Sequence, residues 1–286
     1  MRVLVAGATG YLGGYVAREF KARGCFVRVL TRDRGRLGDL AGLVDEVFEG
    51  EITKPETLTG VCDGVDYVFS SVGITRQKDG LSFWDVDYHG NRHLLDEAQR
   101  AGVRKFVYVS VMNGPKLRHM AIVDAHEQFV EDLAASGLDY AVVRPTGYFS
   151  DMRDFFEMAG HGRVYLFGDG MHSMNPIHGA DLAKVCADAV AGDQTEVPAG
   201  GPDVLTYRDI ARLALEARGM AIKIISVPEW VARLLPKIVK VFHKRSGQTL
   251  EFLTTMLVSD TIAPTHGTHT LRAHFQALAD QAQAKP

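Results

Sequence analysis

The chain has 286 residues, of which 46% are hydrophobic and 23% are charged, and its formal net charge is -3. These values are ordinary for a globular protein, and the length allows one large α/β domain or a domain with a small appendage. The slightly acidic balance disfavours nucleic acid as a partner, because phosphate backbones bind clustered basic surfaces.

The cysteines and the apolar runs bear on the compartment. Cys25, Cys62 and Cys186 are far apart and outside any CxxC spacing, which favours reduced thiols over disulfides or a zinc site. The first apolar run is interrupted by glycines and followed by charged residues, and no apolar stretch approaches the roughly 20 residues of a membrane span. We therefore expect a cytoplasmic protein.

Strands and helices alternate along the first half of the chain. Short apolar, valine-containing runs predict strands at 2–6, 25–30, 46–49, 67–72, 105–110 and 139–143. Amphipathic stretches between them predict helices at 11–23, 87–101 and 123–136. This alternation requires crossover connections, so it predicts a Rossmann-type, doubly wound parallel sheet with helices on both faces.

The pattern is less regular after Pro145. Helices are predicted at 181–190 and 207–218, and two more at 230–235 and 238–242, where Pro236 is expected to break or kink the chain. We expect a dinucleotide-binding core over 1–150 and a small, mainly helical substrate-binding or lid region over 151–286. Within that region, 176–210 is expected to be partly interleaved with the core sheet.

Seven residues between the first strand and the first helix form a glycine-rich turn, Gly7-Ala8-Thr9-Gly10-Tyr11-Leu12-Gly13. In such a turn Gly7 allows the tight bend, Gly10 allows close approach of a pyrophosphate, and Gly13 allows the helix to pack on the strand. The helix N-terminus then offers N–H groups to phosphates. The position of this motif predicts a dinucleotide site, and the alternative is a sterically required turn without a ligand.

The end of the second strand bears on which dinucleotide is bound. An acidic residue here would accept hydrogen bonds from the ribose hydroxyls of NAD, whereas arginine suits the 2′-phosphate of NADP. The sequence has Arg32, with Arg34 and Arg36 as auxiliaries, and this favours NADP(H). Asp33 keeps NAD(H) open as the alternative, and the arginines could also be a solvated charge run.

Several further segments match one family in order along most of the chain. They are the glycine turn, Glu51-Ile52, Ser71-Val72-Gly73, Val86 to Asn91, Val107 to Ser110, Ser136 to Tyr140, Val143 to Thr146, Asn175 to His178 and Asp181 to Ala183. With them the chain resembles the atypical short-chain dehydrogenase/reductases, the NmrA-like or NAD(P)H-binding group. The resemblance implies cofactor contacts from Gly7, Thr9, Gly10, Tyr11, Leu12, Gly13, Arg32, Arg34, Glu51, Ile52, Ser71, Val72, Gly73, Val109, Ser110, His126, Pro145, Thr146 and Tyr148.

The chain departs from the family at the usual Tyr-x-x-x-Lys pair, in which tyrosine exchanges a proton with the substrate. Ile122 stands at the expected tyrosine position and His126 at the lysine position. Histidine titrates near neutral pH, so His126 is a candidate proton donor; the alternative is a hydrogen bond to the ribose or to a neighbouring side chain.

Two other polar positions are weighed in the same way. Ser110, at the end of the fifth predicted strand, is a candidate for hydrogen bonding to substrate or nicotinamide, or for capping the following loop. His178 and Asp181 have no third ligand at a suitable spacing, so we expect a structural hydrogen bond there and no metal site.

A basic amphipathic segment follows Trp230. Its apolar residues alternate with basic ones, which favours a helical lid over a substrate cleft, with an anionic membrane surface or a protein partner as the alternative. The apolar residues are Trp230, Leu234, Leu235, Ile238, Val239 and Phe242, and the basic ones are Arg233, Lys237, Lys240, His243, Lys244 and Arg245.

The resemblance implies an NADPH-dependent oxidoreductase that acts on an apolar or aromatic small molecule, as a monomer or homodimer. The missing tyrosine and lysine keep a second hypothesis open. In it the protein is a non-catalytic NADP(H)-binding redox sensor or assembly subunit that binds a protein partner.

Overall fold

A computed structural model describes residues 1–74 and 80–284 of the chain. The chain forms two compact units. The first comprises Met1–Arg144 and Leu182–Pro198, and the second comprises Pro145–Asp181 and Ala199–Pro286. The chain thus crosses between the units three times, first at the end of a strand of the central sheet.

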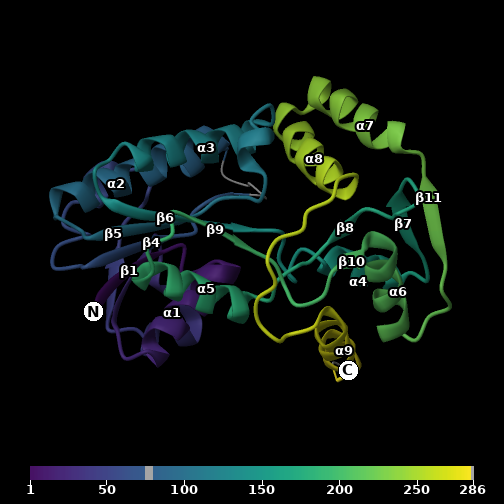
Figure 1. Cartoon of the computed structure of the whole chain (residues 1–286), viewed down its shortest axis with the longest axis horizontal. Helices are drawn as coiled ribbons and strands as arrows, with labels where there is room; N and C mark the ends of the chain where they lie inside the picture. The colour runs from purple at the N-terminus through teal and green to yellow at the C-terminus, as the bar shows by residue number, and fades with distance from the viewer. Residues whose placement is uncertain (75–79, 285–286) are drawn as a thin grey trace. The chain divides into compact units, whose positions relative to one another are not determined.

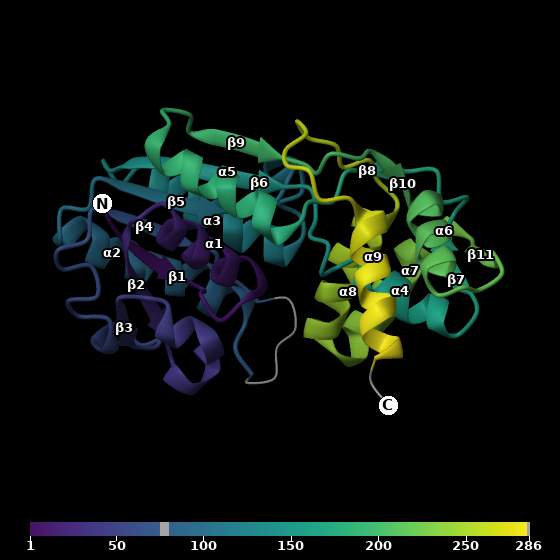
Figure 2. The same cartoon turned by 90° about the horizontal axis from the view of Figure 1, so that it is seen from below.

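The first unit is built on a seven-stranded sheet in the order β3-β2-β1-β4-β5-β6-β9 (Figures 1 and 2). The pairings from β3 to β6 are all parallel, and Val5 on β1, for example, lies between Val29 and Phe69. The predicted Rossmann-type parallel sheet is therefore confirmed. Its strands are β1 (Arg2–Ala6), β2 (Phe26–Thr31), β3 (Glu46–Glu49), β4 (Tyr67–Ser70), β5 (Lys105–Val109), β6 (Asp139–Pro145) and β9 (Glu196–Ala199).

Helices cover both faces of this sheet, as crossover connections require. Two of them, α2 and α3, lie on one face, and α1 and α5 lie on the other, as the two views together show (Figures 1 and 2). The helices are α1 (Tyr11–Ala22), α2 (Asn91–Arg100), α3 (Ala121–Ala134) and α5 (Gly179–Ala191), with a π-helical turn η3 (Trp84–Gly90) and short 3₁₀ segments η1 (Arg34–Gly42), η2 (Pro55–Thr57) and η4 (Gly114–Lys116).

Burial explains why these strands read as apolar runs. Every residue of β5 is buried, because helices lie over both faces of the sheet. Phe106 and Tyr108 of this strand pack against Phe129 of α3, with ring centroids 5.8 and 4.6 Å apart. The predicted helix at 87–101 is regular only from Asn91, since the preceding turn is π-helical.

The second unit has its own core and two small sheets. Strands β7 and β11 pair in parallel, and β8 and β10 pair antiparallel. Its core includes Phe149, Phe155, Phe156 and Phe275. The elements are α4 (Arg153–Gly160), β7 (Val164–Phe167), β8 (Ser173–Met174), β10 (Leu205–Thr206), α6 (Tyr207–Ala217), β11 (Ile224–Val227), α7 (Glu229–Phe242), α8 (Lys244–Leu257) and α9 (Leu271–Gln283).

The predicted break at Pro236 is wrong, because α7 is a single helix through this proline. Proline removes one backbone N–H and crowds the preceding turn, which disfavours a helix interior. Here Pro236 is buried, and α7 packs along α8. The two helices approach closely at Gly247, where a Cβ atom would lie 2.5 Å from the Cα of Lys240. Packing between the helices therefore outweighs the local preference for a break.

None of the helices in the described part of the chain combines the length and the apolar character that crossing a bilayer requires.

Within the second unit, a buried carboxylate at the start of α5 binds residues 268–269. Asp181 accepts hydrogen bonds from the backbone N–H groups of Thr268 and His269, at 3.1 and 3.0 Å, and lies 2.9 Å from Nδ1 of His269. Burial alone would raise the pKa of Asp181, but the bonds from His269 and Thr268 bring it below its ordinary value. The ionised carboxylate is therefore the form that the fold favours.

We expect Asp181→Asn to lower the free energy of unfolding by about 2 kcal/mol at neutral pH, because it weakens charge-assisted hydrogen bonds. A carboxylate whose pKa is lowered by folding stabilises the fold above its unfolded pKa of about 3.9, and this contribution is lost as the pH falls through the lower folded value. The difference between the variant and the parent should therefore shrink below about pH 4. Urea unfolding across this range measures it.

Asp188→Asn is the matched control. It is on the same helix, but its partner Arg23 lies 2.7 Å away at an exposed site, so the loss should stay below about 1 kcal/mol. Equal losses in the two variants would contradict the anchoring role of Asp181.

Candidate functional site

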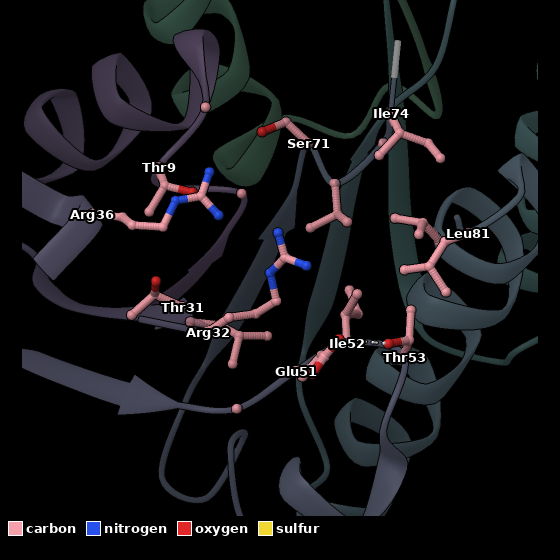
Figure 3. A pocket seen from close by; sticks show the side chains of 17 residues that line it. Thr9, Thr31, Arg32, Arg36, Glu51, Ile52, Thr53, Ser71, Ile74 and Leu81 are labelled. Carbon is pink, nitrogen blue, oxygen red and sulfur yellow. Dashed lines mark hydrogen bonds between the residues drawn. The ribbon is translucent and has the colours of Figure 1, made fainter. Parts of the chain in front are cut away.

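A cavity of about 420 Å³ opens where β1, β2, β3 and β4 end, at the edge where parallel α/β sheets bind ligands (Figure 3). Three groups of residues line it: the glycine turn, the end of β2 with Arg36, and the segments 50–53 and 71–74 together with Leu81 and Val86. All of them belong to the first unit.

The glycine turn is fixed by close backbone contacts. Gly7 has φ +90°, and a Cβ atom there would lie 2.8 Å from Oγ of Ser71. A Cβ on Gly13 would overlap the carbonyl of Gly7, so only glycine lets α1 start this close to β1. The structure therefore gives Gly7 and Gly13 the steric roles that the motif predicts.

The first turn of α1 has the features that favour an anion. The first N–H groups of a helix have no carbonyl partners within it, and Gly10 at the N-cap has no side chain that could cap them. The helix dipole adds positive potential at this end. Gly10 and Thr9 line the cavity, so its wall fits a pyrophosphate group.

Two arginines give the cavity a basic wall. The guanidinium groups of Arg32 and Arg36 both point into it (Figure 3). Arg34 is exposed and lies outside the lining. Asp33 caps the segment η1, where its Oδ1 accepts a 2.8 Å hydrogen bond from the N–H of Gly35. The charge that the end of β2 presents to the cavity is therefore positive.

Glu51 and Ile52 form another part of the lining. A hydrogen bond from Lys54, 2.8 Å away, lowers the pKa of Glu51, with further bonds and charges acting in the same direction. Ile52 packs on Gly90, where a Cβ atom would lie 2.9 Å from its Cγ2. The wall thus combines an ionised carboxylate with a fixed apolar side chain.

Buried polar side chains hold the loop after β4 in place. Asp87 accepts a 3.3 Å hydrogen bond from the N–H of Ile74. Asn91 donates to the carbonyl of Val72 at 3.0 Å and accepts from Ser70 at 2.6 Å. The predicted contact residues Ser71, Val72 and Gly73 lie in this loop and line the cavity.

His126 lies in a buried chain of three polar side chains. Its Nδ1 is 2.6 Å from the hydroxyl of Tyr108, and its Nε2 is 3.1 Å from Oδ1 of Asp87. Burial raises the pKa of Asp87, and the bond from His126 opposes the rise. A Cβ on Gly73 would lie 3.5 Å from Cε1 of His126, so the imidazole lies directly beneath the cavity loop. Ile122, one turn earlier on α3, is buried and apolar.

Ser110 belongs to a separate buried network. Its Oγ donates a 2.7 Å hydrogen bond to Glu127, which also pairs with Arg144 at 2.6 Å. Arg144 reaches Glu196 at 2.5 Å. The bonds from Glu127 and Glu196 raise the pKa of Arg144 despite its burial, so the guanidinium stays charged. In this structure the hydroxyl of Ser110 is engaged in joining β5 to α3.

The other predicted contacts are distributed over both units. Leu12 and Val109 are buried in the first unit, and Tyr11 begins α1. Pro145, Thr146 and Tyr148 fall in the second unit, where Thr146 donates a 2.6 Å hydrogen bond to the carbonyl of Asn175.

The sequence does not predict the two residues that contact His126. Tyr108 reads as a core residue of a strand, and Asp87 was used only as part of a family segment. The available signal was the segment Val86 to Asn91, which places two polar residues four positions apart, on one helical face, in an otherwise amphipathic stretch.

The comparison with known proteins decides the family. The model of the NAD(P)H-binding family matches residues 7–193, about two thirds of the chain. The chain belongs to this family. The predicted family resemblance is thereby confirmed.

Two curated relatives are similar in sequence to this chain over most of their own length. Divinyl chlorophyllide a 8-vinyl-reductase of Zea mays is 30% identical over 99% of this chain and 80% of its own. Photosystem II assembly factor Ycf39 of Synechocystis sp. is 28% identical over 85% of this chain and 76% of its own. The family therefore includes both a reductase and an assembly factor at similar distance from this chain.

Solved structures share the fold. An NADPH-dependent quinone oxidoreductase of Escherichia coli, complexed with NADPH, has a TM-score of 0.72 at 19% identity, over 97% of this chain and 99% of its own. The triphenylmethane reductase of Citrobacter sp., complexed with NADP(H), has a TM-score of 0.73 at 16% identity, over 98% and 100%.

Two adjacent glycines test the cavity wall. We expect Gly13→Ala to weaken NADPH binding by roughly tenfold or more, because its methyl group overlaps the carbonyl of Gly7 and the turn must move. Gly14→Ala should bind normally, since its methyl group meets the flexible end of Arg18 at 3.3 Å and the carbonyl of Ala8 at an ordinary contact distance of 3.5 Å. Fluorescence titration with NADPH measures both, and equal affinities would contradict the steric role of Gly13.

Proposed function

We propose that this cavity binds NADP(H) in preference to NAD(H). The supporting observation is that Arg32 and Arg36 both line the cavity that contains the glycine turn. Guanidinium groups suit a phosphate monoester, because their N–H groups form charge-assisted hydrogen bonds with its oxygens. Asp33, the acidic residue that kept NAD(H) open, instead caps η1.

Single alanine variants separate the three arginines. Arg32→Ala and Arg36→Ala should each weaken NADPH binding by roughly 10- to 100-fold and leave NADH binding nearly unchanged, because only NADPH carries the 2′-phosphate. Arg34→Ala is the control for surface charge, and its NADPH affinity should stay within about twofold of the parent. Equal losses for NADH and NADPH, or a loss in the control as large as in Arg32→Ala, would contradict the assignment.

We further propose that the protein is an oxidoreductase acting on an apolar or aromatic small molecule. Support comes from the reductase among its curated relatives and from the two reductases that share its fold. The nicotinamide supplies the hydride when bound, and the acceptor is a carbonyl or an activated double bond. A steady oxidation of NADPH by some member of a panel of quinones, enones and aldehydes tests this activity.

In this proposal the imidazolium of His126 is the proton source. Asp87 stabilises the protonated ring through its 3.1 Å contact with Nε2, and Tyr108 holds Nδ1. A protonated histidine in a buried site needs a partner of opposite charge, and Asp87 is that partner. The ring lies beneath Gly73, which lines the cofactor cavity.

His126→Gln tests the proton step with an accepting substrate. Glutamine can still hydrogen-bond but cannot carry the proton, so turnover should fall roughly 100-fold. The NADPH affinity is measured in parallel, so that a loss of turnover is separated from a loss of cofactor binding. His89→Gln, on the exposed side of the turn η3, is the control and should keep the parental rate and pH profile. A near-normal rate in His126→Gln would exclude the proton-source role.

A second candidate function is supported by the same contacts. Both ring nitrogens of His126 have buried partners, and the chain lacks the tyrosine and lysine of the family's usual pair. An assembly factor is also among its curated relatives. A protein that binds NADPH tightly, oxidises it with no member of the panel and co-purifies with a defined protein partner would fit an NADP(H)-binding sensor or assembly subunit.

A further inference from the structure

Helix α7 carries an exposed apolar stripe. Trp230, Leu234, Ile238 and Val241 follow the spacing that places residues on one side of a helix, and Phe242 extends this stripe at its end. Trp230 is 64% exposed, Val241 80% and Phe242 77%. These are the most exposed large side chains among the apolar residues that the structure describes.

This stripe is distinct from the surface that packs on α8. The packed side of α7 carries Ala232 and Pro236, which are buried, and Lys240, whose backbone contacts Gly247. The remaining apolar side chains are therefore left over after α7 and α8 have packed together. Exposed apolar clusters of this kind are characteristic of interaction surfaces.

Basic side chains border the stripe. Between residues 229 and 245 there are five lysines and arginines and a single acidic residue, Glu229. Lys240 pairs with Glu251 at 3.2 Å. The other four basic side chains form no ion pair or hydrogen bond with any residue in the described part of the chain. They are Arg233, Lys237, Lys244 and Arg245.

We propose that α7 docks on an anionic lipid surface, lying in the plane of the headgroups. An apolar stripe with aromatic residues inserts at the boundary of the acyl chains, and a basic border pairs with anionic headgroups. The charge of the segment selects an anionic surface over a zwitterionic one. The helix has 14 residues, which rise about 21 Å, so it lies on the surface and does not cross it.

The full-length chain carrying Trp84→Phe gives a direct readout, because Trp230 is then its only tryptophan. Vesicles containing about one third phosphatidylglycerol in phosphatidylcholine should sediment the protein and shift the emission of Trp230 to shorter wavelength. Pure phosphatidylcholine should do so at least roughly tenfold less well. Raising the salt from about 50 to about 500 mM should weaken the anionic binding.

A pair of double variants gives the decisive comparison. Val241→Glu with Phe242→Glu should reduce vesicle binding roughly tenfold or more, because it places carboxylates in the stripe. Met171→Glu with Ile222→Glu adds the same charge at positions that are 57% and 59% exposed and outside α7, and it should bind much more tightly than the first pair. All four sites are exposed, so the thermal midpoint and NADPH affinity should match the parent.

Two results would overturn the proposal. One is a failure of the vesicle test, seen either as no binding to anionic vesicles at low salt or as equal loss of binding in the two double variants. The other is a protein dimer that the first double variant dissociates while vesicles leave the emission of Trp230 unchanged, which would assign this stripe to a second copy of the chain. NADPH titration is independent of both results, so failure here leaves the cofactor assignment to its own tests.

Discussion

The contact between Gly13 and the carbonyl of Gly7 constrains the rest of the first unit. It brings the start of α1 against the end of β1 at a distance that no side chain allows. The same turn carries Gly7 under Ser71, so the ends of β1 and β4 are fixed together. The cavity lies at this junction. Its lining by Thr9 and Gly10, by the two arginines and by the loop 71–74 is arranged around this contact. Binding of a dinucleotide thus follows from backbone geometry more than from any single polar side chain.

The polar network beneath the cavity has a different physical basis. A buried carboxylate such as Asp87 is unfavourable unless its oxygens are hydrogen-bonded. Here Ile74 and His126 supply the bonds, and Tyr108 completes the chain from within the core. The loop that borders the cavity is therefore held by Asp87, which also contacts His126, the residue at the family's lysine position. In the proposed mechanism, the loop that borders the cavity and the proton source are therefore linked through Asp87 and His126.

The parts of this structure that sequence predicts are those fixed by local patterns. The strands up to β6 follow from apolar runs, and the glycine turn from the steric needs of one short segment. At Pro236 the local preference of proline for a helix break is outweighed by packing against α8. That helix is a later segment of the chain, so the pattern around Pro236 carries no sign of the contact. The triad of Asp87, His126 and Tyr108 joins three segments brought together only by the packing of helices on the sheet. Arg36 likewise reaches the cavity from the segment η1, whose start is capped by Asp33.

The central claim is that the basic wall formed by Arg32 and Arg36 selects the phosphorylated dinucleotide. The most direct measurement is the dissociation constant of the unmodified full-length chain for NADPH and for NADH under identical salt conditions. The account predicts that NADPH binds at least roughly tenfold more tightly, since one charge-assisted contact supplies about that much. Equal affinity, or tighter binding of NADH, would contradict it.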